Sequence, residues 1–204
     1  MMIAAVILVA ISCKQAPENI VSDDNTDTST VPIVTTYKVG EFEQGGVIFW
    51  VDNTGQHGLV CAINDQSTAM RWFAGTNGYT QARGNGIYAG MANTTIIIAS
   101  QVAIGDDNDP YAARLCNQLQ VAQDGIQYGD WYLPSRGELN LVYLNKGVIN
   151  STAINNGGTA FADEFYWSSR EYDSRNAYEQ NFEEGSQFFA PKTYPGRVRA
   201  IRTF

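Results

Sequence analysis

Residues 45–63 read GGVIFWVDNTGQHGLVCAI, and this stretch decides the fold. Two runs rich in β-branched and aromatic residues, 45–51 and 58–63, flank the turn-forming segment 52–57. This pattern predicts a β-hairpin. His57, the sole histidine of the sequence, falls at the hairpin tip. One histidine cannot supply the common zinc patterns and makes no convincing Ser-His-Asp triad, so we expect His57 to be exposed and not catalytic.

Further along the chain, residues 64–92 have Gly or Asn every few positions and predict a long irregular loop. Its aromatic residues either form a ligand surface or pin the loop onto the core. Residues 93–103 fit either a strand or a helix capped by Asn93. We expect a core position for Trp50, Trp131 and Trp167, and an exposed one for Trp72.

Two helices are predicted in the middle of the chain. The first is expected to begin with Asp109 as N-cap and Pro110 at the first helical position, followed by an apolar face of Ala112, Leu115 and Leu119. The second follows Ser135, which forms a capping box with Glu138. Strand-like segments follow at 166–169, 176–182 and 197–204. This order predicts an α+β domain with a small, twisted, mostly antiparallel sheet flanked by two helices with long loops.

The length and net charge of the chain limit the number of domains and the classes of partner that it can have. A chain of 204 residues suits one folded domain. Its net charge of −8 excludes a nucleic-acid partner, because phosphate binding needs a basic surface.

The N-terminal end predicts export. Residues 3–11 form an apolar run of signal-peptide length, too short to span a membrane. The run ends in Ala-Ile-Ser-Cys, which resembles the lipobox of bacterial lipoproteins. We therefore expect a signal peptide at 1–12, a lipidated Cys13 that anchors the protein to the membrane, a disordered tether over 13–36, and a folded domain over 37–204. An ordinary secretory signal is the alternative. The expected location is extracytoplasmic, as an outer-membrane lipoprotein facing either the periplasm or the cell surface.

Five motifs stand in a fixed order along the folded part: GGVIFWVDNTGQHGLV, GDWYLPSRGELNLVYLNK, YWSSREY, NAYEQNFEEG and VRAIRTF. Together they resemble the Lcl-type C-terminal domains, a family named after a collagen-like bacterial adhesin. The resemblance implies a C-type-lectin-like fold, surface lipoproteins and adhesins, and glycan or glycosaminoglycan binding by the namesake. The tripeptides of calcium-dependent sugar-binding lectins are missing from the folded part. LPSRGEL is also similar to a stretch of formylglycine-generating enzymes, but no cysteine follows Cys116 to provide their reactive pair.

Aromatic faces and polar groups that could hold a sugar occur in two predicted loops. The candidate ligand-binding residues are Arg71, Trp72, Glu171, Tyr172, Asp173 and Arg175. Ordinary polar loops with salt bridges are the alternative. A second option for an anionic glycan is the C-terminal set Arg197, Arg199 and Arg202, which could equally pair with acids.

No cofactor is expected. A weaker candidate is calcium at Asp106, Asp107 and Asp109, although capping of the following helix explains these acids better. Cys61 and Cys116 form either a disulfide or two buried thiols.

We therefore expect a cell-surface binding or adhesion module for a glycan or extracellular polymer. The alternative is an accessory subunit of an envelope assembly that binds proteins only. An enzyme is not expected. Two acids that converge in a deep cleft, for example two of Glu171, Asp173, Glu179 and Glu183, would change this expectation.

Overall fold

The structure is a computed structural model that describes residues 34–204, which form one compact unit. The expected signal peptide, Cys13 and most of the tether lie outside the described residues and stay predictions. Within the described part of the chain, no helix is long and apolar enough to cross a membrane.

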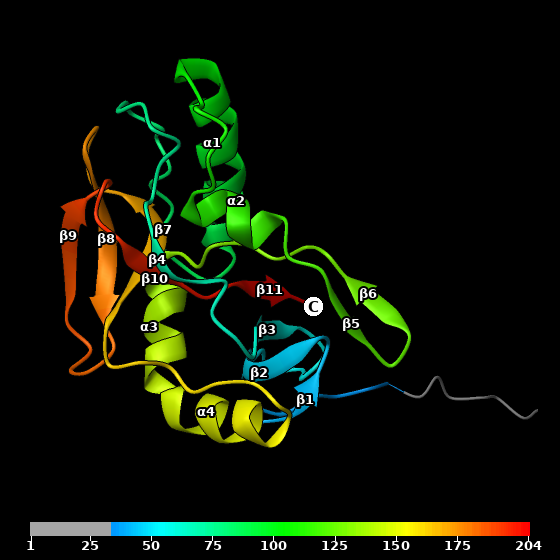
Figure 1. The fold of residues 1–204 in the computed structure, drawn as a ribbon. Helices are drawn as coiled ribbons and strands as arrows, with labels where there is room; N and C mark the ends of the chain where they lie inside the picture. The colour runs from blue at the N-terminus through cyan, green and yellow to red at the C-terminus, as the bar shows by residue number, and fades with distance from the viewer. Residues whose placement is uncertain (1–33) are drawn as a thin grey trace, which may run out of the picture. The chain divides into compact units, whose positions relative to one another are not determined.

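The predicted hairpin is confirmed and lies at the centre of the first sheet (Figure 1). This sheet has the order β1-β2-β3-β11 and is antiparallel throughout. The end of the described chain pairs next to the hairpin, since the backbones of Gly58 and Phe204 exchange two hydrogen bonds of 3.1 and 3.2 Å. Its strands are β1 (Phe42–Glu43), β2 (Gly46–Val51), β3 (Gly58–Cys61) and β11 (Ile201–Thr203).

A second sheet, which the sequence did not separate from the first, has the order β4-β10-β7-β8-β9. Only the pair β10 and β7 is parallel, so the mostly antiparallel prediction holds. The predicted strand over 197–204 divides between the two sheets, because the chain crosses from one to the other at Arg199 and Ala200. The strands are β4 (Ser67–Met70), β7 (Phe165–Glu171), β8 (Asn176–Asn181), β9 (Gln187–Pro191) and β10 (Gly196–Val198).

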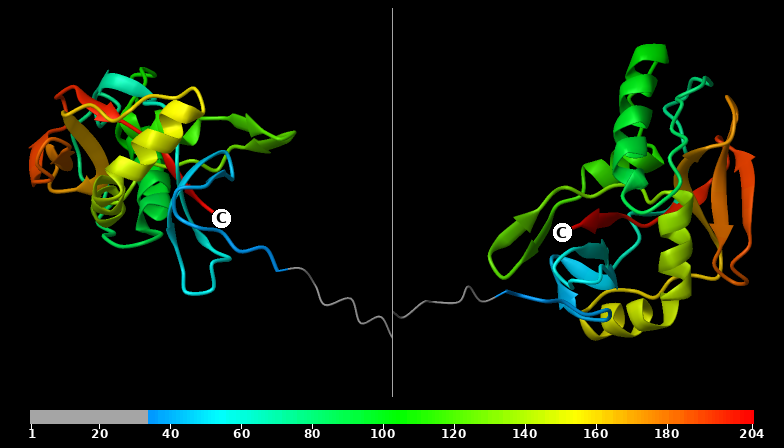
Figure 2. Two further views of the ribbon diagram at one scale, coloured as in Figure 1. Left: turned by 90° about the horizontal axis from the view of Figure 1, so that it is seen from below. Right: turned by 180° about the vertical axis from the view of Figure 1, so that it is seen from behind.

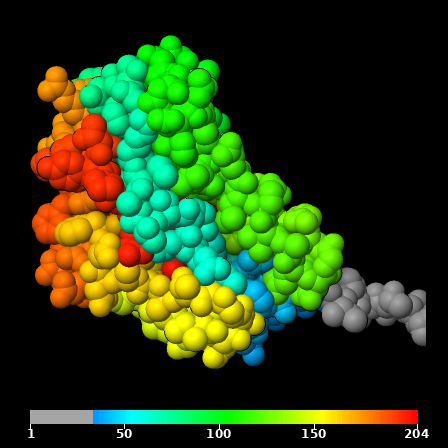
Figure 3. Space-filling model, in the orientation of Figure 1, coloured from blue at the N-terminus to red at the C-terminus, as the bar shows by residue number. Residues whose placement is uncertain are grey.

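A third, two-stranded sheet projects from the body of the domain (Figures 2 and 3). It consists of β5 (Val121–Gln123) and β6 (Ile126–Tyr128), which the sequence analysis missed. Asp124 and Gly125 in the turn have φ of 50° and 81°, the left-handed pair of a two-residue hairpin turn.

The described residues form four helices rather than the expected two: α1 (Ala89–Ile104), α2 (Ala112–Asn117), α3 (Arg136–Leu144) and α4 (Lys146–Asn155). The strand alternative for residues 93–103 is wrong, and Asn93 is not the cap of the helix, because α1 begins earlier, with Tyr88 at its N-cap position. The buried residues of α1 recur at helical spacing because α1 packs one face on β7: Gly90, Asn93, Thr94, Ile97 and Gln101.

The start of α2 also differs from the prediction. Its N-cap position is Tyr111, and Asp109 does not cap it. The reason is a turn before the helix, in which Asn108 has a left-handed φ of 67° and the Asp109 amide donates to Asp107. By contrast, the capping box at the start of α3 is confirmed: the Glu138 amide donates to the Ser135 hydroxyl, and the Ser135 amide donates to the Glu138 carboxylate.

The core lies on both faces of the first sheet. Along β2, Val47 and Phe49 pack with α3 and α4, while Ile48 faces a second cluster that contains three buried tryptophans. This two-sided burial explains why β2 and β3 read as nearly continuous apolar runs. Trp131 and Trp167 are buried as predicted, whereas Trp50 is only partly buried at the edge of the first cluster.

Candidate ligand-binding surface

The structure separates the six candidate ligand residues into buried and exposed groups. Trp72 is completely buried, and its indole N–H donates to the carbonyl of Ser168 over 2.8 Å. The prediction that Trp72 is exposed is therefore wrong. Trp72 follows β4, which pairs with β10, and its side chain packs inward into the buried cluster.

Glu171 is also buried, at the end of β7. Its carboxylate accepts hydrogen bonds from the backbone amides of Thr80 and Gln81 and from the ammonium of Lys192. These contacts occupy the carboxylate inside the protein. Glu171 therefore holds the loop and offers no exposed oxygen to a ligand.

Arg71 belongs to a different group, with the aspartates considered for calcium. Its guanidinium contacts the Asp107 carboxylate at 2.5 and 2.7 Å, which lowers the pKa of Asp107. Asp106 pairs in the same way with Arg114. Residues 34–204 contain no group of three or more His, Cys, Asp or Glu side chains arranged to hold a metal ion. The geometry at Asp106, Asp107 and Asp109 thus gives calcium binding no support.

The other three candidates lie together in the turn between β7 and β8. The Asp173 carboxylate accepts from the Asn176 side chain and from the backbone amides of Arg175 and Asn176, and these bonds lower its pKa. Asp173 thus shapes the turn. Arg175 is exposed on it.

Tyr172 provides the flat face that a ligand could use. Its ring stacks on Phe189 of β9 with centroids 4.1 Å apart and planes 3° apart. Tyr178 of β8 meets it edge-on at 5.5 Å. Tyr172 and Phe189 are 44% and 51% exposed, so the stack is only partly covered by protein.

Arginines border this aromatic stack. The guanidinium carbons of Arg136 and Arg170 lie 4.6 and 5.4 Å from the Tyr178 ring centre. Arg83 and Arg170 line a small cavity of about 210 Å³ together with Tyr172, Tyr178 and the buried Glu171, whose carboxylate is paired with Lys192. The Nε of Arg170 is buried and has no hydrogen-bond partner among the described residues. We call the set Arg83, Arg136, Arg170, Tyr172, Tyr178 and Phe189 the arginine–tyrosine surface.

These arginines differ from the others in having no acidic partner. Residues 34–204 contain nine arginines, and five of them form ion pairs with acids. The four that form none within this part of the chain are Arg83, Arg136, Arg170 and Arg175. A guanidinium without a carboxylate partner is free to bind a carboxylate, sulfate or phosphate group of a ligand.

The alternative C-terminal arginines do pair with acids. Arg199 contacts Asp65 at 2.6 Å, and Arg202 contacts Asp130 at 2.6 Å. Arg197 bridges Asp65 and Glu164 at 3.0 Å each. All three guanidinium groups are paired with acids, which gives them a structural role.

Sequence reasoning found Tyr172 but missed the other members of the arginine–tyrosine surface; Arg175, also a candidate, lies in the same turn as Tyr172. One signal was present. Arg170 and Tyr172 are two residues apart at the end of a strand, and this spacing places both on one face. Arg83 and Arg136 come from a loop and a helix start, and no local pattern links them to that strand.

Cys61 and Cys116 are both free and both buried, so the disulfide alternative is not realised. They belong to different core clusters. Burial raises the pKa of Cys61 to about 12 and that of Cys116 well above its ordinary value. Both therefore act as small apolar side chains.

The fold is a mixed α+β domain built on mostly antiparallel sheets. The chain belongs to the Lcl C-terminal domain family, whose domain matches residues 61–202. This confirms the family indicated by the five motifs.

A comparison with solved structures shows similarity to a fimbrial protein from Bacteroides ovatus ATCC 8483, with a TM-score of 0.53 and 16% sequence identity. The match covers 76% of this chain but only 43% of the fimbrial protein. At this identity the likeness concerns the fold alone. A comparison with curated proteins gave no match.

Proposed function

We propose that this protein is a cell-surface binding or adhesion module that holds a glycan or extracellular polymer at the arginine–tyrosine surface. The observation that carries the proposal is the gathering of three arginines without acidic partners, Arg83, Arg136 and Arg170, beside a half-exposed Tyr172–Phe189 stack. In a chain of net charge −8, such an arrangement favours an anionic ligand at this one place. A sugar ring would stack on Tyr172 while its acidic substituent contacts Arg83 or Arg170.

The family and the fold support this proposal. The chain belongs to the Lcl C-terminal domain family, whose resemblance implies adhesins, and the structural neighbour is a fimbrial protein. We propose a C-type-lectin-like fold on the strength of the family resemblance. We further propose that Cys13 is lipidated and anchors the domain outside the cytoplasm, so that the protein is an outer-membrane lipoprotein. In this proposal the domain needs no cofactor and binds its ligand without catalysing a reaction.

A glycan array tests the proposal. We expect hits among glycans that carry carboxylate or sulfate groups and not among neutral ones. Because ion pairing contributes to binding, affinity should fall as salt is raised. The same array with EDTA tests the calcium candidates Asp106, Asp107 and Asp109, and we expect no change.

A pair of matched variants locates the site. Arg170→Gln should lower affinity for the best acidic glycan at least about tenfold, since a charge-assisted contact is worth roughly 1.5 kcal/mol. Arg71→Gln removes one positive charge at a guanidinium already paired with Asp107 and should leave affinity unchanged. Equal losses in both variants would show a nonspecific charge effect, and binding confined to neutral glycans would contradict the proposal.

A protein partner is the second candidate, because α1 has an uncharged exposed side. No charged residue occurs between Ala89 and Ile104, and Met91, Ile96 and Val102 are 41%, 38% and 63% exposed. Exposed apolar surface of this kind is typical of protein contacts. An envelope partner that cross-links to α1 in cells, together with an empty glycan array, would favour an accessory subunit.

A further inference from the structure

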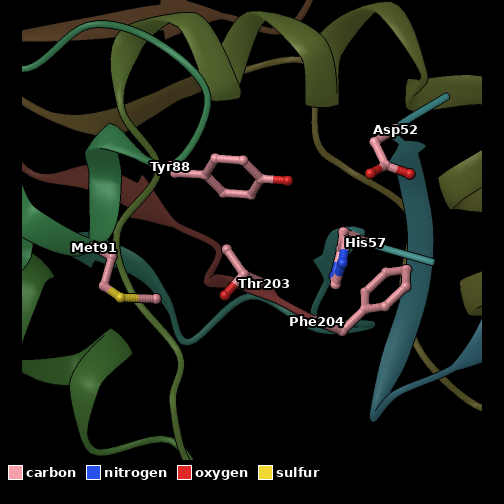
Figure 4. Close-up of a pocket in the computed structure, with 6 residues that line it drawn as sticks. All are labelled: Asp52, His57, Tyr88, Met91, Thr203 and Phe204. Carbon is pink, nitrogen blue, oxygen red and sulfur yellow. The ribbon is translucent and has the colours of Figure 1, made fainter. Parts of the chain in front are cut away.

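A cavity of about 570 Å³ is lined by residues outside the arginine–tyrosine surface (Figure 4). Three segments far apart in the sequence meet there: the hairpin turn after β2, the start of α1 and the end of β11. A volume of this size is typical of small-molecule sites. The lining residues are Asp52, His57, Tyr88, Met91, Thr203 and Phe204.

Tyr88 is held in this cavity in an unusual backbone conformation. Its φ is 69°, a left-handed value that is rare for an aromatic residue. The buried Glu138 carboxylate fixes it there by accepting hydrogen bonds from the amides of Tyr88 and Gly90 at 2.7 and 3.1 Å. The Tyr88 ring meets Trp50 edge-on at 6.0 Å and remains 44% exposed. A strained residue whose aromatic ring stays uncovered is a frequent mark of a binding site.

Asp52 is the acidic residue among those lining the cavity, and no lysine or arginine lines it. Its Oδ1 accepts from the amide and hydroxyl of Thr54, which lowers the pKa of Asp52 and keeps it ionised. In Figure 4, Tyr88 extends its hydroxyl across the cavity toward the side that carries Asp52, His57 and Phe204. Aromatic rings around a carboxylate are complementary to an organic cation.

We infer that this cavity binds a small molecule through an alkylammonium group, which contacts the rings of Tyr88 and Phe204 and pairs with the Asp52 carboxylate. The electronegative faces of the rings attract the cation, and Met91 supplies apolar contact for its carbon atoms. This second site differs from the arginine–tyrosine surface in charge, and it does not depend on the function proposed for that surface.

A pair of isosteric probes tests the charge requirement. Choline carries a trimethylammonium group, and 3,3-dimethylbutan-1-ol has the same shape without the charge. Titrating each into ¹⁵N-labelled protein should shift the amide signals of Tyr88, Met91 and Phe204 with choline and much less with the alcohol. Equal affinities would overturn cation recognition, and no choline-induced shift at these residues would overturn the site.

Matched variants test the carboxylate of Asp52 and the ring of Tyr88 separately. Asp52→Asn should weaken choline binding about threefold to tenfold, whereas Asp124→Asn, the same change in the exposed β5–β6 turn, should have no effect. Tyr88→Gly removes the ring and suits the left-handed backbone, so the protein should remain folded and bind choline more weakly. Tyr88→Phe keeps the ring and should keep the affinity. Unchanged binding in Asp52→Asn or in Tyr88→Gly would refute the inference.

Discussion

The ammonium nitrogen of Lys192 lies 2.7 Å from Oε1 of Glu171, and both side chains are completely buried. The same nitrogen donates to the carbonyls of Gly78 and Ser174, and the carboxylate accepts from the amides of Thr80 and Gln81. One ion pair thus joins the loop after Trp72 to the end of β7 and to the residue that follows β9. Burial lowers the pKa of Lys192, and its bond to Glu171 opposes this effect.

Breaking this pair from one side should destabilise the fold severely. Lys192→Met leaves the Glu171 carboxylate buried without its counter-charge, and we expect the free energy of unfolding to fall by about 3–5 kcal/mol. Adding Glu171→Gln removes the uncompensated charge and should restore part of that loss. Urea unfolding of the two single variants and the double variant measures the coupling. Strictly additive losses would show that the two side chains do not depend on each other.

Glu138 should matter more than an ordinary capping-box residue, because it serves two helices. Besides its contacts with Ser135 at the start of α3, it accepts from Tyr88 and Gly90 at the start of α1 and from the Tyr132 hydroxyl. Glu138→Ala leaves several buried donors without partners and should cost at least about 3 kcal/mol. Ser135→Ala should cost nearer to 1 kcal/mol, the usual value of an N-cap.

Urea unfolding compares the two variants, and amide hydrogen exchange locates the effect. Faster exchange at Tyr88 and Gly90 is expected in Glu138→Ala only. Losses of equal size would mean that the carboxylate contributes nothing beyond the cap of α3.

Glu179 gives a pH dependence whose sign follows from its burial on β8. Burial raises the pKa of Glu179 from 4.5 to about 7. The Glu179 carboxyl therefore binds a proton more tightly in the folded state than in the unfolded state. This difference stabilises the fold fully below pH 4.5, and the stabilisation is lost as the pH rises through 7. Glu179→Gln stays uncharged and should lack this loss.

Thermal or urea unfolding at about pH 5 and pH 8 measures the effect. Relative to the unchanged protein, Glu179→Gln should gain on the order of 1 kcal/mol at the higher pH, a value reduced for the partial exposure of the side chain. The same variant made at the exposed Glu183 should show no such gain. A parallel pH profile for the Glu179 variant and the unchanged protein would contradict the prediction.

The parts of the fold that the sequence predicted are those set by local chemistry. The hairpin, the Ser135–Glu138 capping box and the strand character around Tyr166 each follow from residues close together in the chain. What could not be predicted depends on distant partners. Residues 93–103 carry β-branched side chains typical of a strand, yet they form α1 because its buried face packs on β7. The division of the C-terminal segment between two sheets has no local signal either.

The candidate surface was predicted in part for the same reason. Tyr172 and Arg175 follow a recognisable strand, and an exposed turn was the natural expectation. Trp72 and Glu171 were misplaced because their burial depends on Ser168 and Lys192, partners 96 and 21 residues away. Tyr88 illustrates the limit most clearly, since its left-handed backbone results from a carboxylate 50 residues later.

The cysteines give a last prediction that separates the two alternatives left open by the sequence. In a Cys13→Ser variant, Cys61 and Cys116 are the remaining thiols, and both are completely buried with strongly raised pKa values. Because the thiolate is the reactive form, a thiol reagent should modify neither in the native protein and both after unfolding in urea. Mass spectrometry without reductant should then show two added labels. A native mass lower by two hydrogens, with no label after unfolding, would mean that the two thiols are bonded, which requires the two core clusters to pack differently from the structure.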